Sequence, residues 1–327
     1  MRDEAGSRRS DDPVLGFSCP YTLRIHPQQA VIEGRHANWI RTSGLAEVDG
    51  DTARLDGFGT GWFGAATSPD DSVEFAVLMA DWTCWVLVAD DQVDRVDSAA
   101  DLWPVARLLL LINQCLDDLG RFTIPAHLQS LQPAHATLLR VWHDLCRRLR
   151  DRLGPQVFPV FSSATRELLF GWLACATTHT ATAPILLDDY GIVRSYDGAM
   201  TNNLAMTLAG SRMPVHRWHD PAIVRLMRCA GRIYGFTNDV FTWRGEQNER
   251  LSASLPTILA GLHRVADDEG VSLAIAYVHQ LYDEFDELAV PLSDADPATA
   301  AFIDRVRSHL AGHHHWYSVS RRHDFHD

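Results

Sequence analysis

Residues 71–94 read DSVEFAVLMADWTCWVLVADDQVD, and this stretch is the most informative part of the chain for its architecture. It begins at the helix-start signal SPDD of residues 68–71 and contains neither glycine nor proline. Most of its residues are apolar, which predicts one long helix that is buried in the protein interior. Its last turns differ from the rest, because Asp90, Asp91 and Asp94 bring three carboxylates together at the end of an apolar segment.

The remainder of the chain is also predicted to be helical. Further helices, each ended by glycine, proline or a polar cluster, are expected over residues 102–119, 134–153, 158–180, 197–208, 221–242, 254–266, 271–289 and 297–314. The alternation of apolar and polar residues that marks β-strands does not occur. The sequence therefore predicts an all-α, single-domain bundle of roughly ten helices around a central apolar cavity. This domain is expected over residues 56–327, after an N-terminal tail and irregular segment over residues 1–55.

The composition is that of a globular protein, with 46% hydrophobic and 22% charged residues in a chain of 327. Six cysteines without CxxC spacing are typical of a reducing compartment, so a cytoplasmic location is expected. No run of 18 apolar residues exists, and we therefore expect no membrane span. Residues 1–12, MRDEAGSRRSDD, lack the apolar centre of a secretory signal and are expected to be disordered.

The charge balance limits the classes of partner. A net charge of -13 without a basic stripe argues against nucleic acid. All 29 basic residues other than histidine are arginine, and the absence of lysine excludes both Schiff-base lysine chemistry and a P-loop. A small anionic substrate stays compatible with this charge, because local arginines or bound cations can reverse the field at one site. Arginine also binds phosphate through two parallel hydrogen bonds.

The carboxylates at the end of the first helix need a physical explanation. Asp90 lies about five turns into the helix, where capping of the helix N-terminus cannot account for it. Asp90 and Asp94 share one face with Asp91 beside them, and such charges repel unless a cation lies between them. Mg²⁺ with oxygen ligands suits such a place. A helix end that meets solvent explains the same three residues equally well at this point.

A second polar stripe favours the metal interpretation. In NDVFTWRGE, residues 238–246, Asn238, Thr242 and Glu246 follow one another at intervals of four and lie on one helix face. Amide, hydroxyl and carboxylate oxygens together suit Mg²⁺. An amphipathic helix that turns polar would explain this stripe alone. Two apolar helices that both end in oxygen ligands are much harder to explain without a shared metal site.

These two motifs resemble those of the class I terpene cyclases of bacterial type. The aspartate-rich motif DDxxD of that family is similar to residues 90–94, and its second metal motif, NDxx(S/T)xxxE, is similar to residues 238–246. In RSYDGA, Arg194 corresponds to the arginine that senses diphosphate, Asp197 to the linker residue and Gly198 to the helix break. The motifs occur in the family's order, and the resemblance covers roughly residues 60 to 323.

Near the C-terminus the family has a tryptophan followed by an Arg-Tyr pair. WYSVSRRH resembles this pattern, with Trp316 and Arg322, while His323 stands where the family has tyrosine. The Arg321-Arg322 doublet leaves the register open by one residue. The family often has a basic residue just before the final glutamate of the second motif; here that position is glycine, and Arg244 is the nearest base.

The resemblance implies a class I terpenoid synthase-like fold and an enzyme that is a carbon–oxygen lyase acting on a linear isoprenoid diphosphate. It implies three Mg²⁺ ions, held by Asp90, Asp91, Asp94, Asn238, Thr242 and Glu246. It implies diphosphate contacts from Arg194 and Arg322, with Arg244 and His323 as further candidates. Catalytic roles are expected for Arg194, Asp197, Gly198 and Trp316, the last as an aromatic face toward a carbocation.

The chain length of the substrate and two rival functions stay open. Val86, Leu87, Val88 and Ala89 before the aspartates are aliphatic or small, which favours geranylgeranyl diphosphate over farnesyl diphosphate. A prenyl chain-elongating synthase would share magnesium, diphosphate and a helical fold, but normally has two aspartate-rich motifs. A non-catalytic helical scaffold would release no diphosphate. A homodimer is left open.

Overall fold

The computed structural model describes residues 16–122, 131–179, 185–246 and 253–322, so the tail predicted over residues 1–12 lies outside the described residues. The described part of the chain forms helices and no strand, as predicted. The helices are α1 (Gln29–Ser43), α2 (Ala46–Asp49), α3 (Thr52–Gly57), α4 (Thr60–Thr67), α5 (Val73–Asp94), α6 (Ala99–Asp117), α8 (Pro133–His179), α9 (Leu187–Asp197), α10 (Met200–Leu208), α11 (Pro221–Glu246), α12 (Leu255–His263), α13 (Asp267–Ala295) and α14 (Pro297–Trp316), with a 3₁₀ turn, η1, at Val215–His219.

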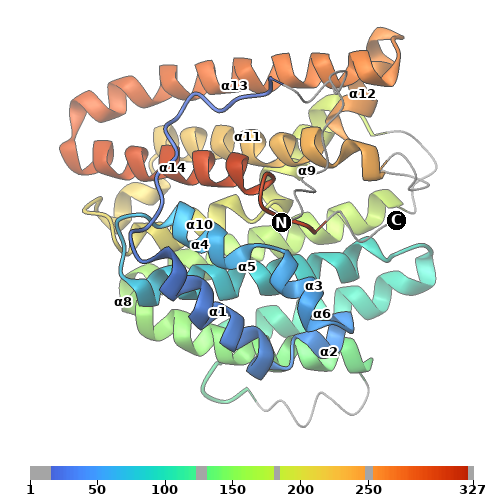
Figure 1. Cartoon of the computed structure of the whole chain (residues 1–327), viewed down its shortest axis with the longest axis vertical. Helices are drawn as coiled ribbons and strands as arrows, with labels where there is room; N and C mark the ends of the chain where they lie inside the picture. The colour runs from blue at the N-terminus through green and yellow to red at the C-terminus, as the bar shows by residue number, and fades with distance from the viewer. Residues whose placement is uncertain (1–15, 123–130, 180–184, 247–252, 323–327) are drawn as a thin grey trace, which may run out of the picture.

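The helices pack into one bundle around a shared core (Figure 1). On one side, α5 contacts α1, α4 and α8, and α6 lies against α8. On the other side, α11 lies between α13 and α9, and α14 contacts α13, α11 and α4. The two sides meet where α5, α11 and α14 end close to the α9–α10 junction, which is where the candidate site lies.

Helix α5 forms as the sequence predicts. Its N-cap is Ser72, whose hydroxyl accepts a hydrogen bond from the backbone N–H of Phe75 at 3.3 Å, and most of its 22 residues are buried. Tryptophans anchor it to α8: the rings of Trp85 and Trp142 stack with centroids 4.8 Å apart. Such aromatic pairs stabilise a fold by about 1 kcal/mol beyond the effect of burying their apolar surface, so the register of α5 against α8 is well determined.

One buried charge in α5 has a structural role. Asp81 is completely buried, and its carboxylate binds His36 at 2.7 Å and Arg148 at 2.6 Å. The other ring nitrogen of His36 lies 2.6 Å from the hydroxyl of Thr60. This network links α1, α4, α5 and α8. A buried carboxylate is tolerated only when it is paired and hydrogen-bonded, and Asp81 has both kinds of partner.

The prediction of irregular structure through residue 55 is wrong for residues 29–55, which form α1, α2 and most of α3. The division of the chain at residue 55 stays a prediction. Helix α1 was missed because it buries only a narrow stripe, Ile32, His36 and Ile40, and its other positions are mostly polar. Such a helix is stabilised by tertiary packing rather than by a strong apolar pattern of its own.

Two helix boundaries also differ from the prediction. Asp197 does not begin a helix; it is the last residue of α9, and α10 begins at Met200. The helices predicted over residues 134–153 and 158–180 lie in one run, α8, that is interrupted at Gly154. Gly154 has φ 70° and ψ 178°, a conformation open to glycine, so the chain turns there as predicted.

The segment before α1 crosses over α14 and α13 (Figure 1). The ring of Phe17 packs edge-on against His314 of α14 with centroids 4.7 Å apart, and it lies 5.4 Å from Phe241 of α11. Tyr21 packs in the same way against Tyr282 of α13. These contacts tie the segment before α1 to α13, to α14 and to α11, which carries the second metal motif.

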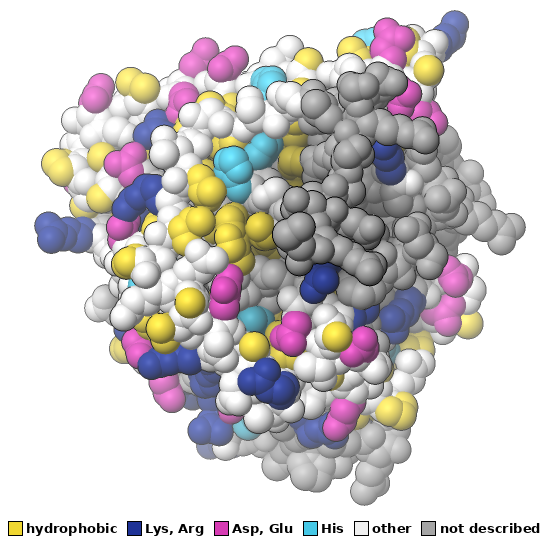
Figure 2. All heavy atoms as spheres, in the orientation of Figure 1, with side chains coloured by type: hydrophobic (Ala, Val, Ile, Leu, Met, Phe, Trp, Pro, Cys, Tyr) yellow, Lys and Arg dark blue, Asp and Glu magenta, His cyan; other side chains and the backbone are white. Residues whose placement is uncertain are grey.

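Helix α6 is long and apolar enough to cross a membrane by length and composition, and 39% of its most apolar window is buried. The core helix of a globular protein passes the same test, so this is weak support for a span. On the face shown in Figure 2, arginine and acidic side chains are scattered among one another, and hydrophobic side chains gather near the centre. No stripe of positive charge follows this face.

Candidate active site

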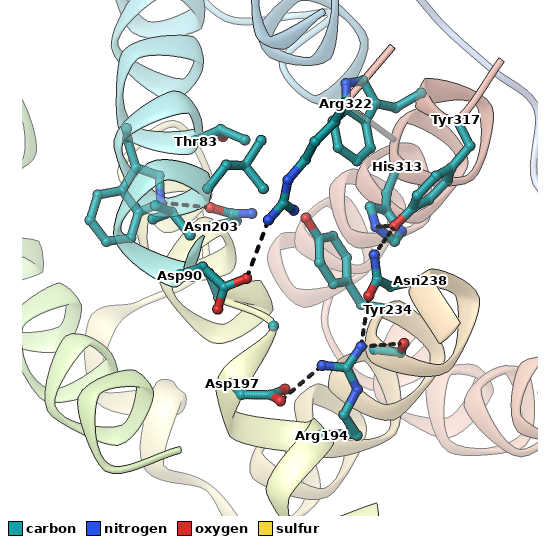
Figure 3. Close-up of a pocket in the computed structure, with 17 residues that line it drawn as sticks. Thr83, Asp90, Arg194, Asp197, Asn203, Tyr234, Asn238, His313, Tyr317 and Arg322 are labelled. Carbon is teal, nitrogen blue, oxygen red and sulfur yellow. Dashed lines mark hydrogen bonds and ion pairs between the residues drawn. The ribbon is translucent and has the colours of Figure 1, made fainter. Parts of the chain in front are cut away.

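A pocket lies between α5, the α9–α10 junction, α11 and α14 (Figure 3). Its empty space is about 580 Å³, part of which is open to solvent. The residues that line it are Trp82, Thr83, Val86, Leu87, Asp90, Arg194, Asp197, Gly198, Ala199, Asn203, Tyr234, Gly235, Asn238, His313, Trp316, Tyr317 and Arg322. Members of all four predicted motifs therefore meet in one cavity.

The three aspartates of the first motif take different positions. Asp90 lines the pocket, and burial raises the pKa of its carboxyl to about 6. Asp91 points to one side, where it binds Arg322 at 2.5 Å and Arg54 at 3.3 Å. Burial by itself would raise the pKa of Asp91, but these two guanidinium groups lower it below its usual value. Asp94 is exposed at the end of α5 and does not line the pocket.

Of the second motif, Asn238 reaches the pocket. Its Oδ1 accepts a hydrogen bond from Arg194 at 2.9 Å, and its Nδ2 donates to the hydroxyl of Tyr317 at 2.8 Å. Thr242 is buried one turn later, and its hydroxyl donates to the backbone carbonyl of Asn238 at 3.0 Å. Glu246 is the last residue of α11, and its side chain lies outside the described part of the structure.

Arg194 is the centre of a buried polar network. One terminal nitrogen donates to Asp197 at 2.8 Å, and the other donates to Asp239 at 2.7 Å and to Asn238. Burial raises the pKa of the Asp197 carboxyl, although Arg194 opposes this shift. The Nε of Arg194 is buried without a hydrogen-bond partner among the described residues. This arginine therefore keeps one donor available for a further acceptor.

Asp239, inside the second motif, has an anchoring position that the sequence did not indicate. Its Oδ1 binds Arg194, and its Oδ2 accepts hydrogen bonds from the Tyr190 hydroxyl at 2.7 Å and from the Leu255 N–H at 2.9 Å. Asp239 thus connects α11 with α9 and with the start of α12. The adjacent Asn238 is held at the pocket by this connection.

Glycines allow the end of α9 to approach its neighbours. A Cβ on Gly235 of α11 would lie 2.9 Å from the carbonyl oxygen of Arg194, and one on Gly171 of α8 would lie 2.8 Å from the backbone nitrogen of Asp197. No side chain larger than hydrogen fits at such distances. The close approach brings the side chain of Arg194 within hydrogen-bonding range of Asn238.

The break between α9 and α10 lies at Gly198 and Ala199, and both residues line the pocket. Ala199 is in the left-handed region, with φ 59°, which costs about 1 kcal/mol for a residue with a Cβ. Gly198 has φ -76°, a conformation that any residue adopts. Instead, the ring of Tyr234 restricts position 198 to a small side chain, because a Cβ there would lie 3.2 Å from this ring.

The C-terminal motif contributes Trp316 and Arg322 to the pocket. Arg322 is buried and bridges Asp91, at 2.5 Å, and Asp90, at 3.6 Å, whereas Arg321 is exposed. Of the two arginines of the doublet, Arg322 is the one that lines the pocket. The Trp316 indole N–H donates to the carbonyl of Phe58 at 2.7 Å, which holds the ring against the pocket.

Of the other two diphosphate candidates, Arg244 does not reach the pocket. Arg244 is exposed, with its guanidinium 5.6 Å from the ring centre of Trp243, and it does not line the cavity. His323 lies outside the described residues. Among the aromatic residues of the helices, Trp82 lines the pocket with Trp316, while Phe170 is 72% exposed.

Several lining residues were missed at the sequence level, above all Tyr234, His313 and Tyr317. The ring of His313 stacks on Tyr234 with centroids 3.5 Å apart, and its Nε2 lies 3.0 Å from the Tyr317 hydroxyl. His309, His313 and Tyr317 follow one another at intervals of four residues and hence share one helix face. This periodicity is the signal that could have found them.

The donor set of the pocket fits a hard divalent cation. Within the described ranges no cluster of three His, Cys, Asp or Glu side chains is arranged to hold a metal. The oxygen donors instead come from two helices, as the Asp90 carboxylate and the Asn238 amide, and a guanidinium lies beside each of them. Carboxylate and amide oxygens are the ligands that Mg²⁺-type ions prefer.

Comparisons with known proteins agree with this geometry. Residues 81–284 match the family described as Terpene synthase family 2, C-terminal metal binding. A (+)-corvol ether B/(+)-corvol ether A synthase from Kitasatospora setae, which cyclizes (2E,6E)-farnesyl diphosphate, is 24% identical over 92% of this chain and 91% of its own length. A sesquiterpene synthase from Metarhizium brunneum is 26% identical over 68% of this chain and 63% of its own.

The fold is that of solved terpene synthases. The crystal structure of 2-methylisoborneol synthase from Streptomyces coelicolor, in complex with Mg²⁺ and 2-fluoroneryl diphosphate, matches 91% of this chain and 95% of its own with a TM-score of 0.77 at 18% identity. This likeness confirms the all-α, single-domain architecture. The match over residues 81–284 also implies divalent metal dependence. The chain belongs to terpene synthase family 2 and is a class I terpene cyclase, a lyase that acts on an isoprenoid diphosphate.

Proposed function

We propose that this chain ionises farnesyl diphosphate and cyclises the resulting carbocation to a sesquiterpene. The relatives support the C15 substrate, because one cyclizes farnesyl diphosphate and another is a sesquiterpene synthase. The expected preference for geranylgeranyl diphosphate is not confirmed. Its basis was weak in structural terms, because Val88 and Ala89 do not line the pocket, whereas the bulky indole of Trp82 does.

The observation that carries the proposal is the meeting of Asp90, Asn238, Arg194 and Arg322 around one pocket. In the reaction the allylic C–O bond breaks, and its electron pair leaves with the diphosphate. Arg194 and Arg322 are proposed to stabilise the charge that develops on the leaving group. Their guanidinium groups suit phosphate oxygens, and the unpartnered Nε of Arg194 supplies a donor. Arg244 and His323 stay predictions.

The metal is proposed to be Mg²⁺, with three ions held by Asp90, Asp91, Asp94, Asn238, Thr242 and Glu246. Bound Mg²⁺ supplies Lewis-acid stabilisation to the leaving diphosphate. The chain's own part is to hold the oxygen donors apart on α5 and α11 and to neutralise them with arginine until substrate arrives. Asp197 is proposed to hold Arg194 in place through its ion pair.

The apolar part of the pocket is proposed to guide the carbocation. Trp82, Tyr234 and Trp316 offer aromatic faces, whose quadrupoles attract a cation. Helix α9 ends at Asp197 and Gly198, which both line the pocket, and the negative end of its dipole is proposed to face the carbocation. Together these groups favour positive charge in the cavity and exclude the water that would quench it.

Incubation with farnesyl diphosphate, geranylgeranyl diphosphate and Mg²⁺ tests the proposal. We expect release of diphosphate and a cyclic C15 hydrocarbon or alcohol from farnesyl diphosphate, identified by gas chromatography with mass spectrometry. Turnover of geranylgeranyl diphosphate alone would instead support the C20 substrate that the sequence favours. Formation of a longer linear diphosphate would identify a chain-elongating synthase. If neither substrate released diphosphate, the non-catalytic helical scaffold would be the function that fits. A cytoplasmic location, the absence of a nucleic-acid partner and a homodimer stay predictions.

A further inference from the structure

The amide of Asn238 has an orientation that its neighbours determine. The guanidinium of Arg194 can only donate hydrogen bonds, so the Asn238 atom that it reaches at 2.9 Å is the carbonyl oxygen Oδ1. The amide nitrogen Nδ2 then points the other way and donates to the hydroxyl of Tyr317 at 2.8 Å. The hydrogen bond from Arg194 therefore determines which end of the Asn238 amide is oxygen and which is nitrogen.

The hydrogen-bond chain continues from Tyr317 to His313. The Tyr317 oxygen accepts from Asn238, so its own proton is directed at the Nε2 of His313, 3.0 Å away. The Nε2 atom must then be the acceptor, and the ring proton of a neutral His313 lies on Nδ1. Burial holds the pKa of His313 well below its ordinary value, so the ring is neutral and can accept at Nε2.

Aromatic packing holds both residues of this chain in place. The Tyr317 ring stacks on Phe241 with centroids 4.5 Å apart and an angle of 12° between the planes. The His313 ring stacks on Tyr234 at 3.5 Å. Two of these partners, Tyr234 and Phe241, belong to α11, the helix that carries Asn238. The rings of α14 are therefore locked against the helix whose amide they orient.

The two ends of an asparagine amide have nearly the same shape but opposite hydrogen-bonding character. A flip by 180° would present the NH₂ group where Oδ1 now lies, and NH₂ cannot ligate a cation. In the structure, the hydrogen bond from Arg194 to Oδ1 prevents this flip. When a cation takes the place of the Arg194 guanidinium at Oδ1, Tyr317 is the remaining described hydrogen-bond partner of this amide.

We propose that Tyr317, oriented by His313, is a positioning residue that keeps Oδ1 of Asn238 directed at the pocket while a divalent cation binds. This inference rests on the proposed function. The partners behind a metal ligand typically change metal affinity by tenfold or more when they are lost. In this role the Tyr317 hydroxyl does not touch the reacting atoms of the substrate and acts only through Asn238.

Binding of Mg²⁺ in the presence of inorganic diphosphate, measured by isothermal titration calorimetry, tests the inference without turnover. Tyr317→Phe keeps the ring on Phe241 and removes only the hydroxyl, so we expect the Mg²⁺ concentration for half-saturation to rise about tenfold. Tyr21→Phe is the matched control, because it removes a hydroxyl that binds Asp286, away from the pocket, at 3.2 Å. The control should bind Mg²⁺ like the parent protein.

A double-mutant cycle separates positioning from general loss of structure. The carboxylate of Asn238→Asp has no nitrogen end, so a flip changes nothing and Tyr317 has nothing to orient. Tyr317→Phe should therefore cost less than about twofold in Mg²⁺ affinity in the Asn238→Asp background. An equal loss in both backgrounds, or no loss in the parent background, overturns the proposal.

A third variant decides the matter if Asn238→Asp does not bind Mg²⁺ at all. His313→Phe removes the acceptor, which leaves the Tyr317 hydroxyl to donate to Oδ1 of a flipped amide. Mg²⁺ affinity should again fall several-fold, and unchanged affinity refutes the inference. The proposed function fails separately: it fails if the parent protein releases no diphosphate from farnesyl diphosphate, whatever these titrations show.

Discussion

The Asp91 carboxylate lies 2.5 Å from the guanidinium of Arg322, although 231 positions separate the two residues in the chain. The same guanidinium lies 3.6 Å from Asp90. One arginine thus pairs with two adjacent carboxylates at the end of α5 and ties them to the turns that follow α14. Because like charges in a half-buried place repel, this contact and the ion pair of Asp91 with Arg54 reduce the repulsion between the two aspartates.

Loss of this arginine should affect both stability and catalysis. Arg322→Gln leaves Asp91 with the ion pair to Arg54, and we expect the free energy of unfolding to fall by about 2 kcal/mol. Diphosphate release should fall about 100-fold, because a donor to the leaving group is lost. Urea unfolding and a diphosphate-release assay measure the two effects. Arg321→Gln is the matched control, since Arg321 is exposed; equal losses in both variants would contradict the assigned register.

Gly235→Ala should separate α9 from α11. Its new Cβ would lie 2.9 Å from the Arg194 carbonyl oxygen, and a backbone atom cannot move aside cheaply. We expect a loss of about 1–3 kcal/mol in stability and at least a tenfold lower kcat, because the contact of Arg194 with Asn238 is displaced. Gly261→Ala in α12 is the control. A Cβ there meets nothing within 4 Å, so this variant should be neutral or slightly more stable.

Asp81→Asn tests the network that joins α1, α4, α5 and α8. Its carboxylate is fully buried and binds both His36 and Arg148. Removal of the charge leaves Arg148 without its counter-ion, and we expect a loss of about 3 kcal/mol in the free energy of unfolding. The gain in stability on adding Mg²⁺ should be the same in this variant as in the parent protein. Asp70→Asn, in an exposed pair with Arg24, should cost less than about 1 kcal/mol; similar losses for both would show that burial is not the cause.

Buried histidines should make the protein less stable in mild acid. Burial lowers the pKa of His309 to about 3 and that of His314 to about 4, from an ordinary 6.5. Between pH 4 and 6.5 the unfolded chain therefore binds more protons than the folded chain at these sites, so their contribution to stability falls as the pH falls. The slope is at most about 1.4 kcal/mol per pH unit for each histidine.

The variant His314→Phe isolates one histidine from the other titrating groups, including Asp90, whose raised pKa acts in the opposite direction. A phenylalanine keeps the apolar contacts with Phe17 and Phe241. Its stability should fall less steeply than that of the parent protein between pH 6.5 and 5, by up to about 1.4 kcal/mol per pH unit. Thermal unfolding at several pH values measures this difference. Parallel profiles would mean that His314 is protonated in the folded state.

Local patterns in the sequence determined the helices that carry the motifs. The long apolar run of α5 and the interval of four from Asn238 to Thr242 each depend on neighbours along the chain, and helical periodicity makes such relationships readable. The interruption at Gly154 was readable for the same reason, because glycine followed by proline disfavours a continuous helix. Order and spacing of the four motifs were enough to indicate the family.

Only the tertiary structure decided which side chains meet. The choice of Arg322 over Arg321, the partners of Asp81, and the orientation of the Asn238 amide by Arg194 and Tyr317 all depend on residues far apart in the chain. Hydrogen bonds and ion pairs act over about 3 Å, and sequence spacing does not reveal such distances between separate helices. The sequence therefore determined the helices that carry the metal motifs and the type of chemistry, and the packing of α5, α9, α11 and α14 determined the site.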